Sequence, residues 1–249
     1  MGEAVALRVR GLKKRFDKPA VAGLDLTIRA GEFYGLLGPN GAGKTTSLRM
    51  IAGLLRPDAG TVEIFGRDAL GDPIAAKRLV AWLPDEPMLY DKLTPLEYLE
   101  FVAGLWGMAV GEAEARARDL LERLELWDQR DQRCEGFSRG MKQKAALAGA
   151  LIHDPRLLIL DEPLTGLDAG IARQVKDLLL ERARAGCTII LTTHILEVAE
   201  RLVDRIGIIR SGVLIVDGTL DELRAKAGSG TSSLEEVFLN LIATPEAAD

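Results

Sequence analysis

The sequence contains few cysteines and few histidines. Only two of each occur among its 249 residues. Cys134 and Cys187 lie far apart and lack the spacing of metal ligands, so we expect both to be reduced thiols. This scarcity argues against a disulfide-stabilised fold and against a metal site built on cysteine.

Long apolar runs are also missing from the sequence. A membrane-spanning helix needs about 18 apolar residues or more, and the closest candidate, residues 98–110, is interrupted by Glu100, Gly104 and Gly107. The first residues lack the charged start, apolar centre and small-residue cleavage site of a signal peptide. We therefore expect a cytoplasmic protein, in which any membrane function depends on a separate spanning polypeptide.

The sequence has no surplus of positive charge. Its 32 Lys and Arg residues stand against 37 Asp and Glu residues, which gives a net charge of −5. Such a balance produces no field that favours nucleic acid, and the short basic stretch 13–15 is interpreted as a solvated rim. No nucleic-acid partner is expected.

The residues that are present form the pattern of an α/β fold. Hydrophobic residues make up 47% of the chain, which is enough for a sizeable core in one α/β unit. Helices are expected at 44–52, around 171–179 and at 234–242, a flexible joint at 228–233, and frayed residues at the end. Alternating or continuous apolar runs predict strands at 5–9, 24–28, 61–65, 157–160, 188–192, 206–209 and 213–216.

The order of these elements indicates a parallel sheet with covered faces, because strands and helices alternate along most of the chain. The middle of the chain differs. From about residue 91 to residue 135 the sequence is charged and helical, which predicts an inserted helical subdomain.

The most informative motif lies between the apolar run 33–37 and a helix-like stretch. It matches G-x-x-x-x-G-K-[ST], a loop whose backbone N–H groups wrap the phosphates of a nucleotide. Its glycines let the chain turn sharply and approach the phosphate oxygens. Lys44 would reach the β- and γ-phosphates, and the Thr45 hydroxyl offers an oxygen ligand for Mg²⁺. The predicted nucleotide-binding residues here are Gly38, Pro39, Asn40, Gly41, Ala42, Gly43, Lys44, Thr45 and Thr46.

A second motif is the apolar strand 157–160, which is followed directly by Asp161 and Glu162. Adjacent side chains on an extended chain point in different directions, so the two carboxylates can hold separate roles. Asp161 suits a role in holding Mg²⁺. Glu162 suits the base that orients or deprotonates an attacking water.

A third motif, residues 137–143, opens an Ala-rich helix with Ser138, Arg139 and Gly140. Ser138 is a good N-cap. Because a helix start also favours an anion, the same residue could instead face a γ-phosphate. From these residues alone both interpretations stay open.

Taken in order, these motifs followed by Asp168 and by His194 after a strand resemble the ATP-binding cassette (ABC) ATPases. The resemblance covers about residues 4–217. It implies a P-loop core with a mainly parallel sheet, an N-terminal antiparallel β subdomain, a helical subdomain inserted at about 91–150, and a C-terminal helical tail at 218–249.

The resemblance also implies a shared ATP site. In this family two nucleotide-binding domains enclose two ATP molecules, so Ser138 and Gly140 would touch the γ-phosphate bound by a partner. Phe16 would stack on adenine, with a core Phe as the alternative. Asp168 would link the two sites, with a generic turn aspartate as the alternative. His194 would bond the γ-phosphate, with a core histidine as the alternative, and His153 is interpreted as structural.

Two positions depart from the family pattern. Arg139 stands where a small residue is common, and could either add positive charge near the triphosphate or point to solvent. Asp85 stands where many members carry a glutamine that contacts Mg²⁺ and senses the transport subunit. Asp85 keeps an oxygen ligand but loses the amide donor, so a metal contact is expected, with a proline-framed surface turn as the alternative. Its coupling role is left open.

These departures and residues 233–238 are similar to a branch of bacterial ABC exporters with separate membrane subunits. The resemblance therefore implies an ATP-hydrolysing subunit with ATP and Mg²⁺ as cofactors, a second ATPase subunit and a membrane permease as partners, and a place on the inner face of the membrane. The alternative is a soluble ATPase switch on a non-membrane complex, although no second cassette or long basic insertion supports it.

Overall fold

The computed structural model describes residues 4–226 and 233–243. The joint predicted at 228–233 lies outside the described residues except for Ser233, and so do the last residues, 244–249. No helix within the described ranges is both long and apolar enough to cross a membrane.

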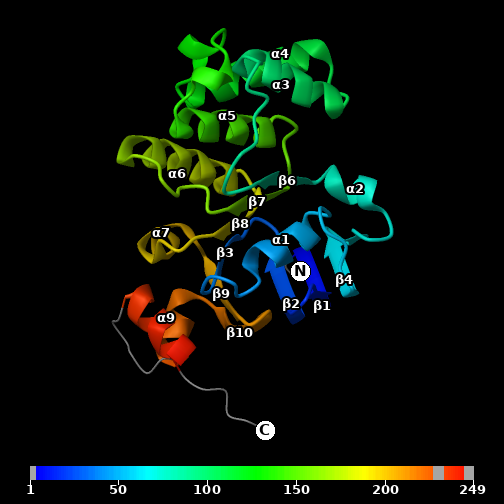
Figure 1. Cartoon of the computed structure of the whole chain (residues 1–249), viewed down its shortest axis with the longest axis vertical. Helices are drawn as coiled ribbons and strands as arrows, with labels where there is room; N and C mark the ends of the chain where they lie inside the picture. The colour runs from blue at the N-terminus through cyan, green and yellow to red at the C-terminus, as the bar shows by residue number, and fades with distance from the viewer. Residues whose placement is uncertain (1–3, 227–232, 244–249) are drawn as a thin grey trace.

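A six-stranded sheet forms the centre of the molecule, in the order β10-β9-β3-β8-β7-β6 (Figure 1). All neighbours pair in parallel except β10 and β9, which confirms the predicted, mainly parallel core. The strands are β3 (Phe33–Leu37), β6 (Val80–Leu83), β7 (Leu157–Asp161), β8 (Thr188–Thr192), β9 (Arg205–Arg210) and β10 (Val213–Gly218).

Both faces of this sheet are covered. Leu158 and Leu160 of β7 join a core with the helical layers, whereas Leu157 and Ile159 join a core with α1 (Lys44–Ile51) and the N-terminal strands. Successive side chains of a strand point to opposite faces, so one short apolar strand serves two cores. This explains why β7 reads as a continuous apolar run.

The second sheet is antiparallel, with the order β2-β1-β4-β5. It confirms the expected N-terminal β subdomain. Its strands run further than the apolar patterns at 5–9 and 24–28 predicted, because hydrogen-bonded pairing continues into the polar ends of a hairpin. The elements are β1 (Val5–Arg15), β2 (Pro19–Arg29), β4 (Ala59–Ile64) and β5 (Arg67–Asp68), followed by α2 (Pro73–Lys77).

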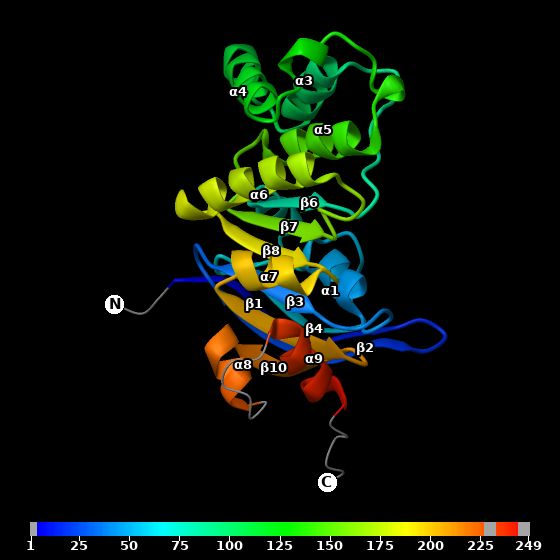
Figure 2. The same ribbon diagram turned by 90° about the vertical axis from the view of Figure 1, so that its left-hand side faces the viewer.

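The helical subdomain forms one end of the molecule in both views (Figures 1 and 2). It contains α3 (Pro95–Leu105), α4 (Val110–Arg123), α5 (Arg139–Leu151) and two short 3₁₀ turns, η1 (Trp127–Gln129) and η2 (Cys134–Gly136). Apolar side chains such as Leu99, Leu121 and Leu147 join its core. The predicted insertion is therefore confirmed as helical.

The opposite end carries α8 (Leu220–Lys226) and α9 (Leu234–Ala243) (Figure 2). Leu223, Leu234 and Val237 of these helices are buried in one cluster with Ile206 and Ile208 of β9. The helix predicted at 234–242 is thus confirmed. The division of the chain at residue 217 stays a prediction.

Candidate active site

The phosphate-binding motif lies at the carboxyl end of β3, where the chain turns into α1. Gly41 and Gly43 have φ values of +78° and +101°, a region that favours glycine. A Cβ on Gly43 would lie 2.4 Å from the Ala20 carbonyl oxygen, and one on Gly38 would lie 2.3 Å from that of Ile209. Neighbouring backbone therefore already requires glycine at positions 38 and 43, in addition to the phosphate approach that the sequence predicts.

Lys44 folds back over this loop. Its Nζ donates to the carbonyl oxygens of Gly38 at 2.7 Å and Pro39 at 3.1 Å. Burial lowers the pKa of Lys44, while the negative charges of Glu162 and Asp161 raise it. The ammonium is thus held at the mouth of the loop, close to the carboxylates of β7.

Thr45, Asp161 and Thr192 form a hydrogen-bonded group beneath the loop. The Thr45 hydroxyl donates to Asp161 Oδ2 at 2.8 Å, and the Thr192 hydroxyl donates to Asp161 Oδ1 at 2.6 Å. Asp161 is only 4% exposed, so both carboxylate oxygens are fixed. Sequence reasoning predicted Thr45 and Asp161 but missed Thr192, which was assigned only to a strand.

This donor set fits Mg²⁺, which prefers a few protein oxygens and completes its shell with phosphates and water. A hydroxyl and a carboxylate lie together at the foot of the P-loop. No group of three or more His, Cys, Asp or Glu side chains within the described residues could hold a metal by itself. The protein therefore offers part of a shell, as expected for an ion that arrives with a nucleotide.

Glu162 does not continue the strand. Its φ of +50° turns the chain out of the extended conformation, so the premise that both carboxylates lie on extended chain is wrong for this residue. The turn still separates them: Glu162 Oε2 accepts from His194 Nδ1 at 2.9 Å and from the Thr165 hydroxyl at 3.2 Å. The side chain of His194 is 61% exposed, which rules out the core alternative.

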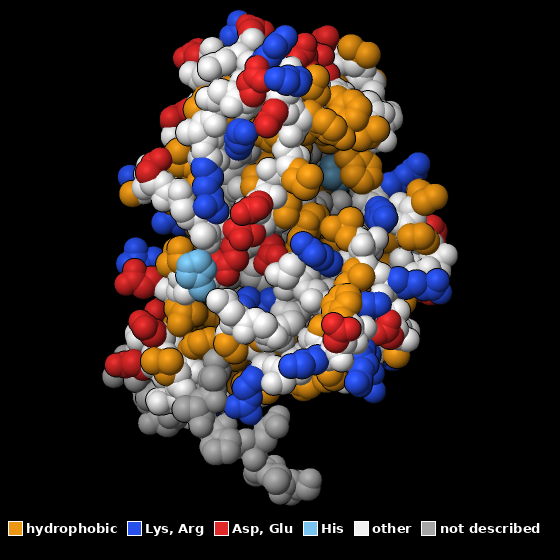
Figure 3. All heavy atoms as spheres, viewed as in Figure 1, with side chains coloured by type: hydrophobic (Ala, Val, Ile, Leu, Met, Phe, Trp, Pro, Cys, Tyr) orange, Lys and Arg blue, Asp and Glu red, His pale blue; other side chains and the backbone are white. Residues whose placement is uncertain are grey.

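A pocket of about 440 Å³ lies over the P-loop, Asp161 and Glu162, and Figure 3 shows acidic side chains gathered in the hollow of this face. Phe16 at its rim is 58% exposed, so the core alternative is wrong for this residue as well. The Nζ atom of Lys14 lies 5.8 Å from the ring centroid. The lining residues are Phe16, Ala20, Asn40, Gly41, Ala42, Gly43, Lys44, Thr45, Thr46, Asp85, Asp161 and Glu162.

The residues of the third motif do not line this pocket. Ser138 caps α5 by accepting from the Met141 N–H at 3.3 Å, and Asp168 caps α6 (Ala169–Arg184) by accepting from the Ile171 N–H at 2.9 Å. A Cβ on Gly140 would lie 2.4 Å from Cδ1 of Ile171. Each residue thus has a structural role within the chain, while Ser138 remains exposed.

Arg139 is about half exposed, and its side chain contacts a residue with which the sequence analysis did not pair it. Its Nη2 lies 3.7 Å from Oδ1 of Asp85 in the same chain. Sequence reasoning singled out both residues but did not pair them, because nothing in the sequence shows that α5 begins beside the turn after β6.

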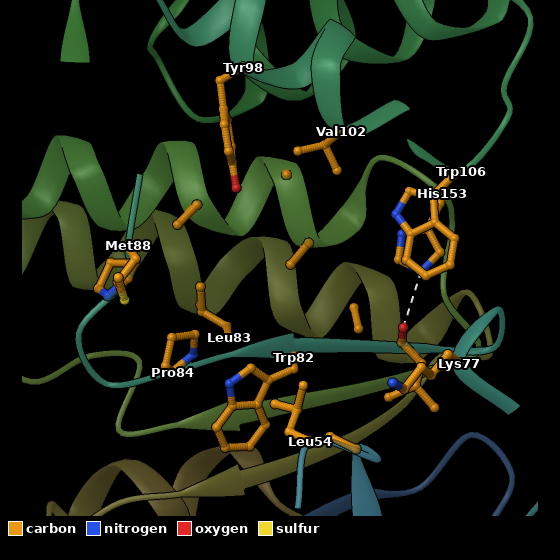
Figure 4. A pocket seen from close by; sticks show the side chains of 17 residues that line it. Leu54, Lys77, Trp82, Leu83, Pro84, Met88, Tyr98, Val102, Trp106 and His153 are labelled. Carbon is orange, nitrogen blue, oxygen red and sulfur yellow. Dashed lines mark hydrogen bonds between the residues drawn. The ribbon is translucent and has the colours of Figure 1, made fainter. Parts of the chain in front are cut away.

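A second, apolar cleft of about 410 Å³ lies between the helical subdomain and the parallel sheet (Figure 4). Met88 at its edge is 91% exposed. Trp106 stacks on His153, with 4.0 Å between the ring centroids, and His153 Nε2 lies 3.2 Å from the Val80 carbonyl oxygen. Burial lowers the pKa of His153. The cleft is lined by Leu54, Trp82, Leu83, Pro84, Met88, Tyr98, Val102, Trp106 and His153, among others.

Comparison with known proteins gives a consistent result. The family profile described as "ABC transporter" matches residues 21–165. The chain is 41% identical over 224 residues to a daunorubicin resistance ATP-binding protein, DrrA3, of Streptomyces coeruleorubidus, an alignment that covers 90% of this chain and 71% of that protein.

Solved structures with the same fold are also known. One, described as the ATP-binding subunit of an ABC transporter, superposes with a TM-score of 0.89 and 34% identity and covers 95% of this chain and 99% of its own. Another is a dimeric ATP-binding cassette, MJ0796, in a post-hydrolysis state with ADP and phosphate. It superposes with a TM-score of 0.78 and 25% identity over 86% of this chain and 98% of its own.

Proposed function

Since the chain belongs to the ABC transporter ATP-binding family and is an ATPase of that family, we propose that two copies close around two Mg-ATP and power a separate membrane permease. The observation that carries this proposal is that the predicted site residues form two separate groups within one chain. The P-loop, Asp161 and Glu162 line one pocket, whereas Ser138, Gly140 and Asp168 lie outside it. A second copy would supply those residues.

At each site the P-loop amides and Lys44 bind the phosphates, because both present positive charge toward the pocket. Thr45 and Asp161 would hold Mg²⁺, which when bound neutralises phosphate charge and fixes the phosphate oxygens. Phe16 would stack on adenine from the rim. The metal contact predicted for Asp85 stays a prediction, since the contact present in the chain is with Arg139.

Glu162 is the base in this proposal. Its carboxylate lies at the pocket wall and would accept a proton from, or orient, the water that attacks the γ-phosphate. His194 holds Glu162 by a 2.9 Å contact and is exposed enough to reach the γ-phosphate. Ser138 of the second copy would donate its hydroxyl to that phosphate, and Arg139 and Gly140 would approach it with the positive end of α5.

The apolar cleft is the proposed site for a permease. It is open, lined by aliphatic and aromatic side chains, and borders the turn that carries Asp85. Such a cleft suits a short amphipathic helix from a membrane subunit. With a permease bound there, the chain would lie on the inner face of the membrane. Export is the direction we propose, because the similar Streptomyces protein is named for drug resistance.

Glu162→Gln tests the proposal most simply. We expect ATP hydrolysis to fall by about 10²- to 10⁴-fold while ATP still binds, and the variant to sediment as a dimer only with Mg-ATP. Glu181→Gln makes the same chemical change on the exposed side of α6 and serves as the control. Normal turnover, or ATP-bound chains that remain monomeric, would contradict the proposal.

The cleft needs its own test. Met88→Glu places a charge in the apolar cleft, so co-purification with a membrane protein should be lost. Leu239→Glu alters a residue of α9 that is also exposed, at 58%, and should retain the partner. If no membrane protein co-purifies with the unaltered chain, the result favours the alternative of a soluble ATPase switch.

A further inference from the structure

The two departures from the family pattern meet in space. Arg139 is the first residue of α5 and Asp85 lies in the turn after β6, yet Nη2 of Arg139 and Oδ1 of Asp85 are 3.7 Å apart. Both side chains are about half exposed, at 54% and 49%. The pair connects the helical subdomain to the wall of the ATP pocket, which Asp85 lines.

A third segment makes room for this pair. Gly166, in the loop between β7 and α6, has a φ of +72°. A Cβ at this position would lie 2.9 Å from Nη1 and 3.0 Å from Cζ of Arg139. Glycine therefore leaves space for the guanidinium, which is bordered by the turn after β6 and by the loop after β7.

Electrostatics explain why the pair forms. Arg139 places a positive charge at the positive end of the α5 dipole, and no acidic residue occupies the first turn of α5. Asp85, in contrast, is a negative charge that lies close to other negative charges. Desolvation raises the pKa of Asp85, Arg139 lowers it, and the nearby charges of Glu162 and Asp161 raise it. Because each member of the pair lies near charge of its own sign, the contact between them offsets electrostatic repulsion at both residues.

We propose that Asp85 is a counter-ion in the same chain for the start of α5, and that it holds the place which the partner's terminal phosphate takes in the closed dimer. Arg139 must leave Asp85 when two copies close on ATP. The pair therefore opposes closure, and Asp85 sets how much ATP is needed for closure. This inference rests on the proposed function, because it requires that α5 faces a nucleotide bound by a second copy.

The pair is weak enough to act in this way. Exposed ion pairs change equilibrium constants by about 1.5- to 5-fold. A dimer breaks two of them, so removing Asp85 should tighten closure by about 2- to 25-fold. This is an adjustment that ATP binding can overcome in every cycle.

The test uses the full chain carrying Glu162→Gln, so that ATP is retained. Sedimentation with Mg-ATP measures the dimerisation constant. Adding Asp85→Asn should tighten the dimer by the stated factor, and the gain should vanish when Arg139→Gln is also present. Asp91→Asn is the matched control. It removes the partner of Lys142, a contact of 2.9 Å in the first turn of the same helix, but lies outside the pocket lining, so the constant should not change.

Three results would overturn the inference. If Asp85→Asn tightens the dimer equally without Arg139, its charge acts directly on the bound triphosphate. If Asp85→Asn weakens Mg-ATP binding, Asp85 is a metal ligand. If Asp85→Asn has no effect while the Glu162→Gln chain dimerises, the pair has no role in closure.

A second measurement does not depend on dimerisation. In nucleotide-free chains at low salt, Asp85→Asn and Arg139→Gln should shift the melting temperature non-additively, whereas Asp91→Asn and Arg139→Gln should add. If the melting-temperature shifts of Asp85→Asn and Arg139→Gln are strictly additive, the two side chains do not interact, which would contradict the ion pair itself. Absence of any ATP-driven dimer in the Glu162→Gln chain, with this non-additivity present, would contradict the proposed function and not the pair.

Discussion

The polar contacts beneath the P-loop differ from those at the start of α5. Asp161 is 4% exposed and accepts two hydroxyl hydrogen bonds of 2.6 and 2.8 Å. Arg139 and Asp85 are about half exposed and 3.7 Å apart. In the proposed closed dimer, each nucleotide would meet the P-loop region of one copy and the start of α5 of the other.

The proposed cycle accounts for this difference. Hydrogen bonds in a buried group are strong and fix geometry, which suits phosphate and metal binding that must be ready before ATP arrives. Exposed ion pairs contribute little and break easily. This suits the helix start, which in the proposed cycle exchanges one anion for another each time the dimer opens and closes.

Among the variants that probe the two regions, Lys44→Ala should lower ATPase activity most. It removes the cation held at the mouth of the P-loop, so ATPase activity should fall by about 100-fold or more. Lys92→Ala removes a cation from an exposed pair with Glu135 and should change nothing measurable. An ATPase assay on both variants checks this. Near-normal ATPase activity of Lys44→Ala would mean that the P-loop is not the rigid phosphate-binding part of the site.

Thr192→Val should have the next largest effect. It removes a buried donor to Asp161 and should lower the free energy of unfolding by about 1.5–3 kcal/mol, together with ATPase activity. Thr188→Val alters another fully buried threonine of β8, whose hydroxyl accepts from the Gly31 N–H, and should lower stability alone. Denaturant melts and ATPase assays separate the two. Equal ATPase activities would remove Thr192 from the site.

Ser138→Ala should lower the free energy of unfolding by less than Thr192→Val does. Loss of an N-cap destabilises a protein by about 1 kcal/mol, and here it should also weaken the ATP-driven dimer. Thr94→Ala removes the cap of α3, which also forms a capping box with Glu97, and should affect stability only. If both variants dimerise like the unaltered chain, Ser138 is a cap and nothing more.

Asp91→Asn should have the smallest effect. It opens an exposed pair with Lys142, so the free energy of unfolding should fall by less than about 1 kcal/mol. That loss should disappear as salt rises from about 0.05 to 0.5 M, whereas the loss in Thr192→Val should persist. Melts at the two salt concentrations check this, and an equal salt response would contradict the distinction between the regions.

The grouping of the P-loop with Asp161 and Glu162 was predictable from the sequence, and the structure brings these residues around one pocket. The P-loop follows β3 and Asp161 ends β7, and only β8 separates these two strands in the parallel part of the sheet. Parallel strands bring their carboxyl ends to one edge of a sheet, so the two motifs meet there. Periodicity likewise located β7, β8 and α1 within a residue or two. Local chemistry and strand order were enough here.

The remaining features depend on packing between distant segments. The Arg139 contact, the role of Thr192 and the apolar cleft require α5 to lie beside β6 and β8 to lie beside β7. Neither the charged pattern of the insertion nor the apolar pattern of β8 fixes which side chains meet. The left-handed turn at Glu162 was also missed, because the residue type gives no signal for a positive φ.

Mixing two inactive variants tests the central claim most directly. Lys44→Ala disables the P-loop of one chain, and Ser138→Arg places bulk on the exposed start of α5 in another. Each alone should be inactive. If each site combines the P-loop of one copy with α5 of the other, the mixture contains one intact site per mixed dimer and regains ATPase activity. A mixture that stays inactive, with both chains folded and Ser138→Arg still binding ATP, would contradict the shared site.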